Sequence, residues 1–237
     1  MFGLKNCTSQ ADSPEVQVFN RNLDESQRDA VTFAQSQNEF CIIHGPPGTG
    51  KTTSLVEIIS QEVAEKKKVL FSAPSNIAVD NITERLARAG FRVVRLGHPA
   101  RVTEGCRQHT LDWKFVSQFD LVRKLEARIK LSKMHSRQSE VGEKFKQEKG
   151  KLDRLIARCL EEADVVLGTL VTCGKEGPLR SLKSNHFQLT VIDECSQAKE
   201  ASCWLVIPRS PKLILAGDYH QLPPTVHNKV ILNWMTD

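Results

Sequence analysis

The 237-residue sequence predicts an α/β fold in which a parallel β-sheet is covered by helices on both faces. Three observations lead to this prediction. Six short runs are almost continuously apolar, as expected for strands that are buried on both sides of a parallel sheet. Segments with helical periodicity follow several of these runs. Polar motifs come directly after the runs, and the carboxyl ends of parallel strands meet at one edge, so these motifs are expected to share one site.

The predicted strands cover residues 40–44, 69–73, 92–96, 164–168, 189–193 and 212–216. A helix is expected over Thr52–Lys66, where apolar residues recur with helical spacing. The face of this helix expected to be buried consists of Leu55, Val56, Ile59 and Val63. A second helix is predicted to begin at Ser75 or Asn76 and to stop at Gly90.

One long charged stretch interrupts the alternation. Residues 120–163 have helical periodicity, and the polar segment 136–142 is the predicted turn of a helical hairpin within an insertion of about residues 104–163. The stretch 120–163 contains twelve Lys/Arg and eight Asp/Glu, which is +4 of the chain's net charge of +5. It can be a basic arm over nucleic acid or a solvated hairpin of mixed surface charge. The interspersed charges favour the second interpretation.

The composition, 40% hydrophobic and 26% charged, is ordinary for a globular protein. No apolar run approaches the roughly 20 residues of a membrane span, and the polar start of the chain lacks the apolar segment of a signal peptide. The seven cysteines show no metal-ligand spacing, which favours reduced thiols in an intracellular protein. The net charge of +5 permits a polyanionic partner.

Residues 45–53 form a complete phosphate-binding loop (P-loop), G-x-x-x-x-G-K-[ST], between a predicted strand and a predicted helix. Its glycines let backbone N–H groups approach a polyphosphate, and the helix N-terminus adds partial positive charge. Lys51 is expected to reach the β- and γ-phosphates of ATP, and the Thr52 hydroxyl is expected to bind Mg²⁺. The predicted ATP-binding residues here are Gly45, Pro46, Pro47, Gly48, Thr49, Gly50, Lys51, Thr52 and Thr53.

Two carboxylates, Asp193 and Glu194, end the predicted strand 189–193. Asp193 is expected to hold Mg²⁺ opposite Thr52, directly or through water. Glu194 is expected to orient and deprotonate the attacking water. An ordinary acidic turn is the alternative, and the P-loop in the same chain argues against it. A P-loop kinase has less use for the second carboxylate.

A polar loop, Gly217–Pro224, follows the next predicted strand. The amide of Gln221 can donate to a γ-phosphate and accept from the attacking water, so we expect it to sense the nucleotide state. Asp218 leaves the strand end beside it. A proline-rich turn without this role is the alternative.

Two further polar clusters can be explained in two ways. Ser75 and Asn76 are candidate N-caps of the second helix, and their hydroxyl and amide groups also suit a nucleic-acid phosphate. Thr169 and Thr172 offer the same chemistry after another strand. Gln27 lies three residues after Asp24, the pattern of a helix capping box; a Gln amide can also pair with the adenine edge.

These motifs together resemble the first motor domain of superfamily-1 helicases of the up-frameshift type. The similar segments are Ser-Gln near residue 27, GPPGTGKTT, APSNIAVDN, VIDECSQA and GDYHQLPP. Within that group, LGHPAR and the EASCW that follows IDECSQA are most similar to the immunoglobulin-mu-binding (Smubp-type) helicases. The resemblance covers about residues 19–229.

The resemblance implies a RecA-like P-loop NTPase fold, Mg²⁺-dependent ATP hydrolysis and 5′-to-3′ unwinding of RNA and DNA. It implies cytoplasmic and nuclear localisation, and ribosome- or transcription-associated complexes as partners. The catalytic residues implied are Lys51, Asp193, Glu194 and Gln221. Gln27 would contact adenine. The implied contacts to single-stranded nucleic acid are Pro74, Ser75, Asn76 and Thr169.

The expected organisation is a flexible lead-in at 1–20, an ATP-binding domain at 21–229 and a divergent tail at 230–237. The second RecA-like domain of the family, which supplies arginine fingers, and the family's oligonucleotide-binding insertion are not found in this sequence. We therefore expect a truncated chain that does not unwind duplexes alone. The main alternative is a module that binds nucleotide and nucleic acid without motor activity.

Overall fold

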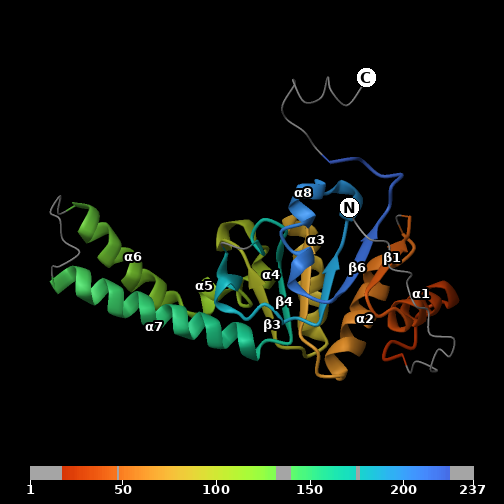
Figure 1. The fold of residues 1–237 in the computed structure, drawn as a ribbon, viewed down its shortest axis with the longest axis horizontal. Coiled ribbons are helices and arrows are strands. Elements are labelled where there is room, and N and C mark those ends of the chain that lie inside the picture. Colours follow the sequence, from red (N-terminus) through yellow and green to blue (C-terminus); the bar gives the residue numbers. More distant parts are fainter. Residues whose placement is uncertain (1–17, 47, 132–139, 175–176, 225–237) are drawn as a thin grey trace, which may run out of the picture.

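The computed structural model describes residues 18–46, 48–131, 140–174 and 177–224. Within them, six parallel strands form one sheet in the order β1-β6-β5-β2-β4-β3 (Figure 1). The strands are β1 (Phe40–His44), β2 (Val69–Ala73), β3 (Val93–Leu96), β4 (Val165–Thr169), β5 (Leu189–Ile192) and β6 (Lys212–Gly217). The predicted strands are confirmed to within one residue at each end. The predicted α/β fold with a parallel sheet is therefore correct.

Three helices cover one face of the sheet, namely α1 (Glu25–Ser36), α2 (Lys51–Ala64) and α3 (Asn76–Arg88). They bury apolar side chains such as Ile58 and Ile82 against alternate strand residues such as Phe71 and Val191. The opposite face is covered by α5 (Leu111–Lys114), α7 (Glu140–Glu162), α8 (Glu200–Cys203) and the loops after β4. Their side chains pack on strand residues such as Leu70, Val166 and Ile192. Alternate residues of a strand point to opposite faces, so both faces of the central strands are buried.

The buried face of α2 is wider than its sequence pattern predicts. Leu55 and Ile59 are fully buried as expected, but Val56 and Val63 are only half-buried. Ile58 is also fully buried, because α2 lies between α1 and α3 and packs on both. A helix with neighbours on two sides hides more than the single stripe that faces the sheet.

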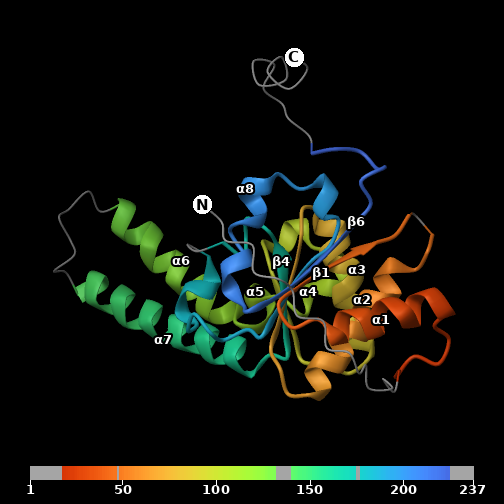
Figure 2. The ribbon, with the colours of Figure 1, turned by 45° about the vertical axis from the view of Figure 1, so that its right-hand side comes forward.

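The helical insertion extends from the β3–β4 side of the sheet. It consists of two short helices, α4 (Glu104–Arg107) and α5 (Leu111–Lys114), and two long helices, α6 (Val116–Leu131) and α7 (Glu140–Glu162). Figures 1 and 2 both show α6 and α7 side by side as a projecting hairpin, and the two helices pack against each other. Most of the predicted turn at 136–142 lies outside the described residues. The helical hairpin itself is confirmed.

The other described elements are one short helix and several 3₁₀ turns that connect the strands. A short helix, α8 (Glu200–Cys203), and four 3₁₀ turns lie between the strands; the turns cover Pro99–Arg101, Pro178–Ser181, Cys195–Gln197 and Ile207–Arg209. None of the helices in the described part of the chain is long and apolar enough to span a membrane. Most of the predicted lead-in at 1–20, and the whole predicted tail at 230–237, lie outside the described residues.

Candidate nucleotide and nucleic-acid site

The phosphate-binding loop joins β1 to α2 at the carboxyl edge of the sheet. The backbone N–H of Gly45 donates to the carbonyl of Gly217 (3.2 Å), which ties the loop to the end of β6. A Cβ atom on Gly45 would lie 2.8 Å from the Thr49 hydroxyl, so a larger residue there would displace that side chain. Gly50 has a left-handed backbone (φ 76°) that also favours glycine. The loop is therefore a cradle of exposed backbone, as polyphosphate binding requires.

Helix α2 begins at Lys51 without a side-chain cap. Its first N–H groups and its partial positive charge therefore face the loop. Lys51 and Thr52 occupy the first two helical positions, at the P-loop end of α2. Their contacts with phosphate and Mg²⁺ stay predictions. The hydroxyl of Thr53 accepts a hydrogen bond from Arg85 of α3 (3.3 Å). The other predicted loop residues are Pro46, Pro47, Gly48 and Thr49. Of these, Pro47 lies outside the described residues.

The two predicted carboxylates follow β5, two strands away from the P-loop strand. Asp193 is buried and accepts the backbone N–H of Glu194 (2.8 Å); burial raises the pKa of its carboxyl to about 6. Glu194 takes a left-handed backbone (φ 53°), which is uncommon for a residue with a Cβ. A carboxylate oxygen of Glu194 lies 3.7 Å from the ammonium of Lys51. The structure therefore brings the predicted base and the predicted P-loop lysine together.

A chain of side-chain amides joins Glu194 to Gln221. The amide nitrogen of Gln197 donates to Oε2 of Glu194 (3.0 Å) and to Oε1 of Gln221 (3.1 Å). Gln221 in turn donates to Asp218 (3.3 Å). Sequence reasoning missed Gln197. The feature of the sequence that could have indicated Gln197 is its side-chain amide three residues after Glu194, at the end of the 3₁₀ turn Cys195–Gln197.

Asp218 connects this chain back to β1. Its carboxylate also lies 3.2 Å from Nε2 of His44, the residue that precedes the P-loop. The backbone N–H of His220, followed by the side chains of His44 and Gln221, holds the pKa of Asp218 below its usual range. The ring of Tyr219 stacks on His44 with 4.8 Å between centroids. The loop that carries Gln221 is thus attached to the carboxyl end of β1, directly before the P-loop.

Gln27 contacts the P-loop and caps its own helix. Its Oε1 accepts the backbone N–H of Asp24 (3.2 Å), and Asp24 accepts the backbone N–H of Gln27 (2.8 Å), which completes the capping box. Its amide nitrogen donates to the carbonyl of Thr49 (3.0 Å). The capping interpretation is thus correct as far as it goes, and the amide also lies over the P-loop. Its contact with adenine stays a prediction.

The residues predicted to contact nucleic acid lie together at the carboxyl ends of β2 and β4. Pro74 and Ser75 follow β2, and Ala73 is in register with Thr169 on the adjacent strand. The hydroxyl of Ser75 accepts the backbone N–H of Ala78 (3.1 Å), so Ser75 is the N-cap of α3. The hydroxyls of Thr169 and Thr172 are hydrogen-bonded to each other (2.8 Å). Among the described residues no hydrogen bond or ion pair joins Pro74, Ser75, Asn76 or Thr169 to the P-loop, although β5 and β2 are neighbours.

A buried arginine supports this second group. Arg95 of β3 is fully buried and its Nε lies 2.7 Å from Asp80 of α3, which is also buried. Its guanidinium also donates to the Asn76 side chain (2.9 Å) and to the carbonyl of Leu96. Asp80 accepts the backbone N–H of Thr103 as well (2.8 Å). This network fixes the start of α3 against β3 and the first residues of the insertion.

With this geometry established, comparison with known proteins identifies the family. A family described as "AAA domain" matches residues 22–127 and 116–229, which is most of the chain. The chain belongs to the AAA domain family. This membership agrees with the P-loop and with the parallel sheet that carries it.

Curated relatives of this AAA domain are helicases and a DNA-binding protein. The chain is 44% identical to "DNA-binding protein SMUBP-2" of Mesocricetus auratus. The match covers 90% of the chain but only 23% of that protein. It is 38% identical to "DNA polymerase alpha-associated DNA helicase A" of Schizosaccharomyces pombe over 91% of the chain and 34% of that protein. It is 32% identical to "ATP-dependent helicase upf1" of the same yeast over 88% of the chain and 23% of that protein. The resemblance to superfamily-1 helicases is confirmed.

Solved structures agree on the fold. The chain resembles the UvsW helicase from bacteriophage T4 in two crystal structures. The TM-scores are 0.50 and 0.52, with 13% and 15% sequence identity over 87% of this AAA domain and 58% and 33% of those chains. At this identity the likeness shows the fold alone, and that fold is the α/β architecture of Figure 1.

Proposed function

We propose that this AAA domain is the ATP-binding motor domain of an ATP-dependent helicase that moves 5′ to 3′ on single-stranded RNA and DNA. The observation that carries the proposal is the continuous set of contacts from Lys51 through Glu194 and Gln197 to Gln221. It joins a phosphate-binding lysine, a candidate base and a candidate γ-phosphate sensor at one sheet edge. The names of the relatives, which include ATP-dependent and DNA helicases, support the same activity.

The residues present fit ATP and Mg²⁺. Gly48 and Gly50 have left-handed backbones that favour glycine, a Cβ on Gly48 would meet open space, and α2 begins behind the loop without a side-chain cap. In the proposed site Lys51 binds the β- and γ-phosphates, and Thr52 and Asp193 hold Mg²⁺. Held by these residues, Mg²⁺ would supply positive charge to offset the negative charge that develops on the phosphates during hydrolysis.

The chain's own groups perform the remaining steps of the proposal. Glu194 accepts the proton of the attacking water, and Gln197 holds its carboxylate in place. Gln221 donates to the γ-phosphate, so the loop it belongs to responds to the nucleotide state. Gln27 pairs with adenine after it releases the carbonyl of Thr49. Because these groups surround one cradle, loss of the γ-phosphate removes a partner from several of them at once.

The second group at the sheet edge is proposed to hold the nucleic acid. Pro74, Ser75, Asn76 and Thr169 would contact the sugar-phosphate backbone of a single strand, without reading its sequence. By the same resemblance we propose a protein that works in the cytoplasm and the nucleus, in ribosome- or transcription-associated complexes. The chain spans only 23% to 34% of the relatives compared above, so unwinding is not proposed for this domain alone.

Glu194→Gln tests the proposal. The variant is expected to bind Mg²⁺–ATP within about threefold of the unaltered chain. Its hydrolysis should fall by roughly 10²–10⁴-fold, the usual cost of losing a general base. Nucleotide titration and single-turnover hydrolysis with a single-stranded oligonucleotide measure both quantities. Glu161→Gln, at an exposed site on α7, is the matched control. Turnover that persists, or affinity that collapses together with the rate, would contradict the role assigned to Glu194.

A further inference from the structure

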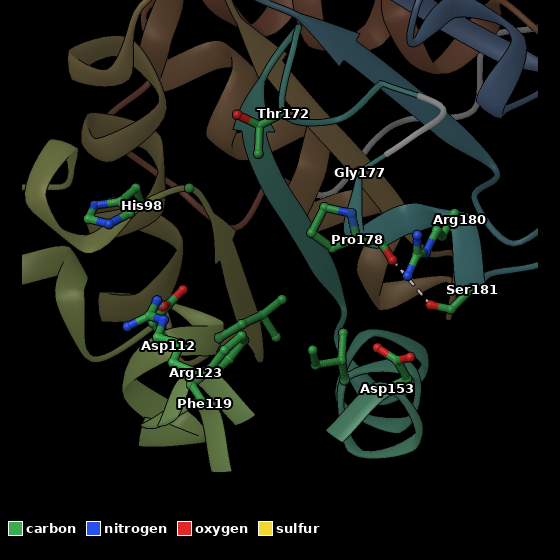
Figure 3. A pocket seen from close by; sticks show the side chains of 13 residues that line it. His98, Asp112, Phe119, Arg123, Asp153, Thr172, Gly177, Pro178, Arg180 and Ser181 are labelled. Carbon is green, nitrogen blue, oxygen red and sulfur yellow. Dashed lines mark hydrogen bonds and ion pairs between the residues drawn. The ribbon is translucent and has the colours of Figure 1, made fainter. Parts of the chain in front are cut away.

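A pocket of about 840 Å³ lies between the base of the helical hairpin and the loops that follow β3 and β4. Figure 3 shows His98 on one side, Pro178 and Arg180 on the opposite side, and Thr172 and Asp153 on two further sides. Its volume is in the range of pockets that hold small molecules. None of the proposed ATP-binding residues lines it.

The lining combines an apolar surface with unpaired polar groups. Phe119 and Ile156 supply apolar area from α6 and α7. Arg123 is paired with Asp112 (2.9 Å). The side chains of Asp153 and Arg180 form no hydrogen bond or ion pair with any residue that the structure describes. Both side chains are exposed, so they are free to contact a ligand that pairs an apolar body with hydrogen-bond donors for the carboxylate and an anionic group for the guanidinium.

The pocket lies next to the proposed nucleic-acid contacts, which favours a nucleotide as its ligand. Thr172 lines the pocket, and its hydroxyl is hydrogen-bonded to that of Thr169 (2.8 Å). Thr169 is a proposed contact to the backbone of the single strand. A nucleotide whose phosphate lies at these two hydroxyls would have its base beside the pocket opening.

We propose that this pocket takes one unstacked base of the bound single strand. The Arg123 guanidinium lies over the Phe119 ring, 5.7 Å from its centroid, and together they offer planar groups on which a single-stranded base can stack. Asp153 accepts from an exocyclic amino group, as acidic side chains do from cytosine, and Arg180 binds an adjacent phosphate. Uracil and thymine lack that amino group and are held less tightly. The inference rests on the proposed binding of a single strand.

An abasic scan tests it. Single-stranded 12-mers with one abasic site, moved along the strand, are titrated against the full chain by fluorescence anisotropy. For the unaltered protein one abasic position is expected to weaken binding by roughly tenfold, a typical stacking contribution. In Phe119→Ala, and separately in Asp153→Ala with Arg180→Gln, that penalty should disappear, because the pocket no longer holds the base. The double variant keeps Phe119 and so guards against loss of folding.

The control is Arg128→Gln, which removes a positive charge from an exposed site on α6 outside the pocket. It should keep the abasic penalty, and any change in affinity should be the same for every position of the abasic site. If the unaltered chain binds strands but its abasic penalty is unchanged in both pocket variants, the pocket inference is wrong and the proposed function stands. If the chain binds no single strand, the proposed nucleic-acid binding and this inference both fail.

Discussion

Arg95→Met removes the positive charge of the buried ion pair and keeps a long apolar side chain. The pair has no access to water, since Arg95 is 0% and Asp80 is 3% exposed. After the change the carboxylate of Asp80 keeps the backbone N–H of Thr103 and loses its cation. Asn76 also loses the guanidinium that holds its side chain.

The expected cost follows from this burial. Removing one partner of a buried ion pair leaves an uncompensated charge and lowers the free energy of unfolding by about 3–5 kcal/mol. In a chain of this size, 1 kcal/mol corresponds to a change in melting temperature of about 2–4 °C. Arg95→Met should therefore melt roughly 6–20 °C lower. Removing both charges, in Arg95→Met with Asp80→Leu, should recover part of this loss, because no buried charge is left unpaired.

Thermal unfolding followed by circular dichroism measures the effect. The matched control is Arg88→Met, whose partner Glu84 and whose own guanidinium are both exposed. An exposed pair contributes at most about 1 kcal/mol, so the control should melt within a few degrees of the unaltered chain. The reasoning is refuted if Arg95→Met and Arg88→Met melt at the same temperature, or if the double variant is less stable than Arg95→Met alone.

Three further predictions concern catalysis, pH and salt. Gln197→Leu should lower single-turnover ATP hydrolysis about 10- to 100-fold, since Glu194 and Gln221 lose their shared donor, while nucleotide affinity stays within threefold. Burial alone would raise the pKa of Glu62, but hydrogen bonds from Lys212 and Lys67 lower it below 4.5. The ionised Glu62 carboxylate therefore stabilises the fold above pH 4.5, and this stabilisation is lost as the pH falls below 4.5 through the lowered pKa of Glu62. Glu62→Gln should lower the free energy of unfolding at pH 7 by about 2–4 kcal/mol and flatten its decline below pH 4.5, as urea titrations would show. Single-strand binding should weaken steeply between about 50 and 200 mM salt, and a salt-independent affinity in anisotropy titrations would contradict phosphate contacts.

The sequence predicts the fold well because its signals are local. Most ends of the apolar runs are marked by a polar, glycine or proline residue, so the strands are found to within a residue. The P-loop is equally local, since its glycines, Lys51 and Thr52 are contiguous. The sequence also predicts the capping roles of Gln27 and Ser75, because an N-cap interaction joins residues only three positions apart.

What the sequence could not show depends on contacts between distant segments. Arg95 lies between Val94 and Leu96 in a predicted strand that also contains Arg92, and only the fold places Asp80 beside Arg95. The same holds for Gln197, whose partner Gln221 comes from a loop 24 residues later. The pocket under the hairpin is a further case, because five separate segments converge on it. Such sites arise from the packing of elements and have no pattern of their own.

Binding of Mg²⁺–ATP tests the central claim most directly. Titration of the chain with a fluorescent ATP analogue should give measurable, weak affinity that depends on Mg²⁺. Lys51→Ala should lower this affinity by about 10-fold or more, because a charge-assisted contact to phosphate contributes about 1.5–3 kcal/mol. Lys183→Ala, at an exposed site away from the loop, should leave it unchanged. Equal affinity of the unaltered chain and Lys51→Ala would show that the phosphate-binding loop is not the nucleotide site.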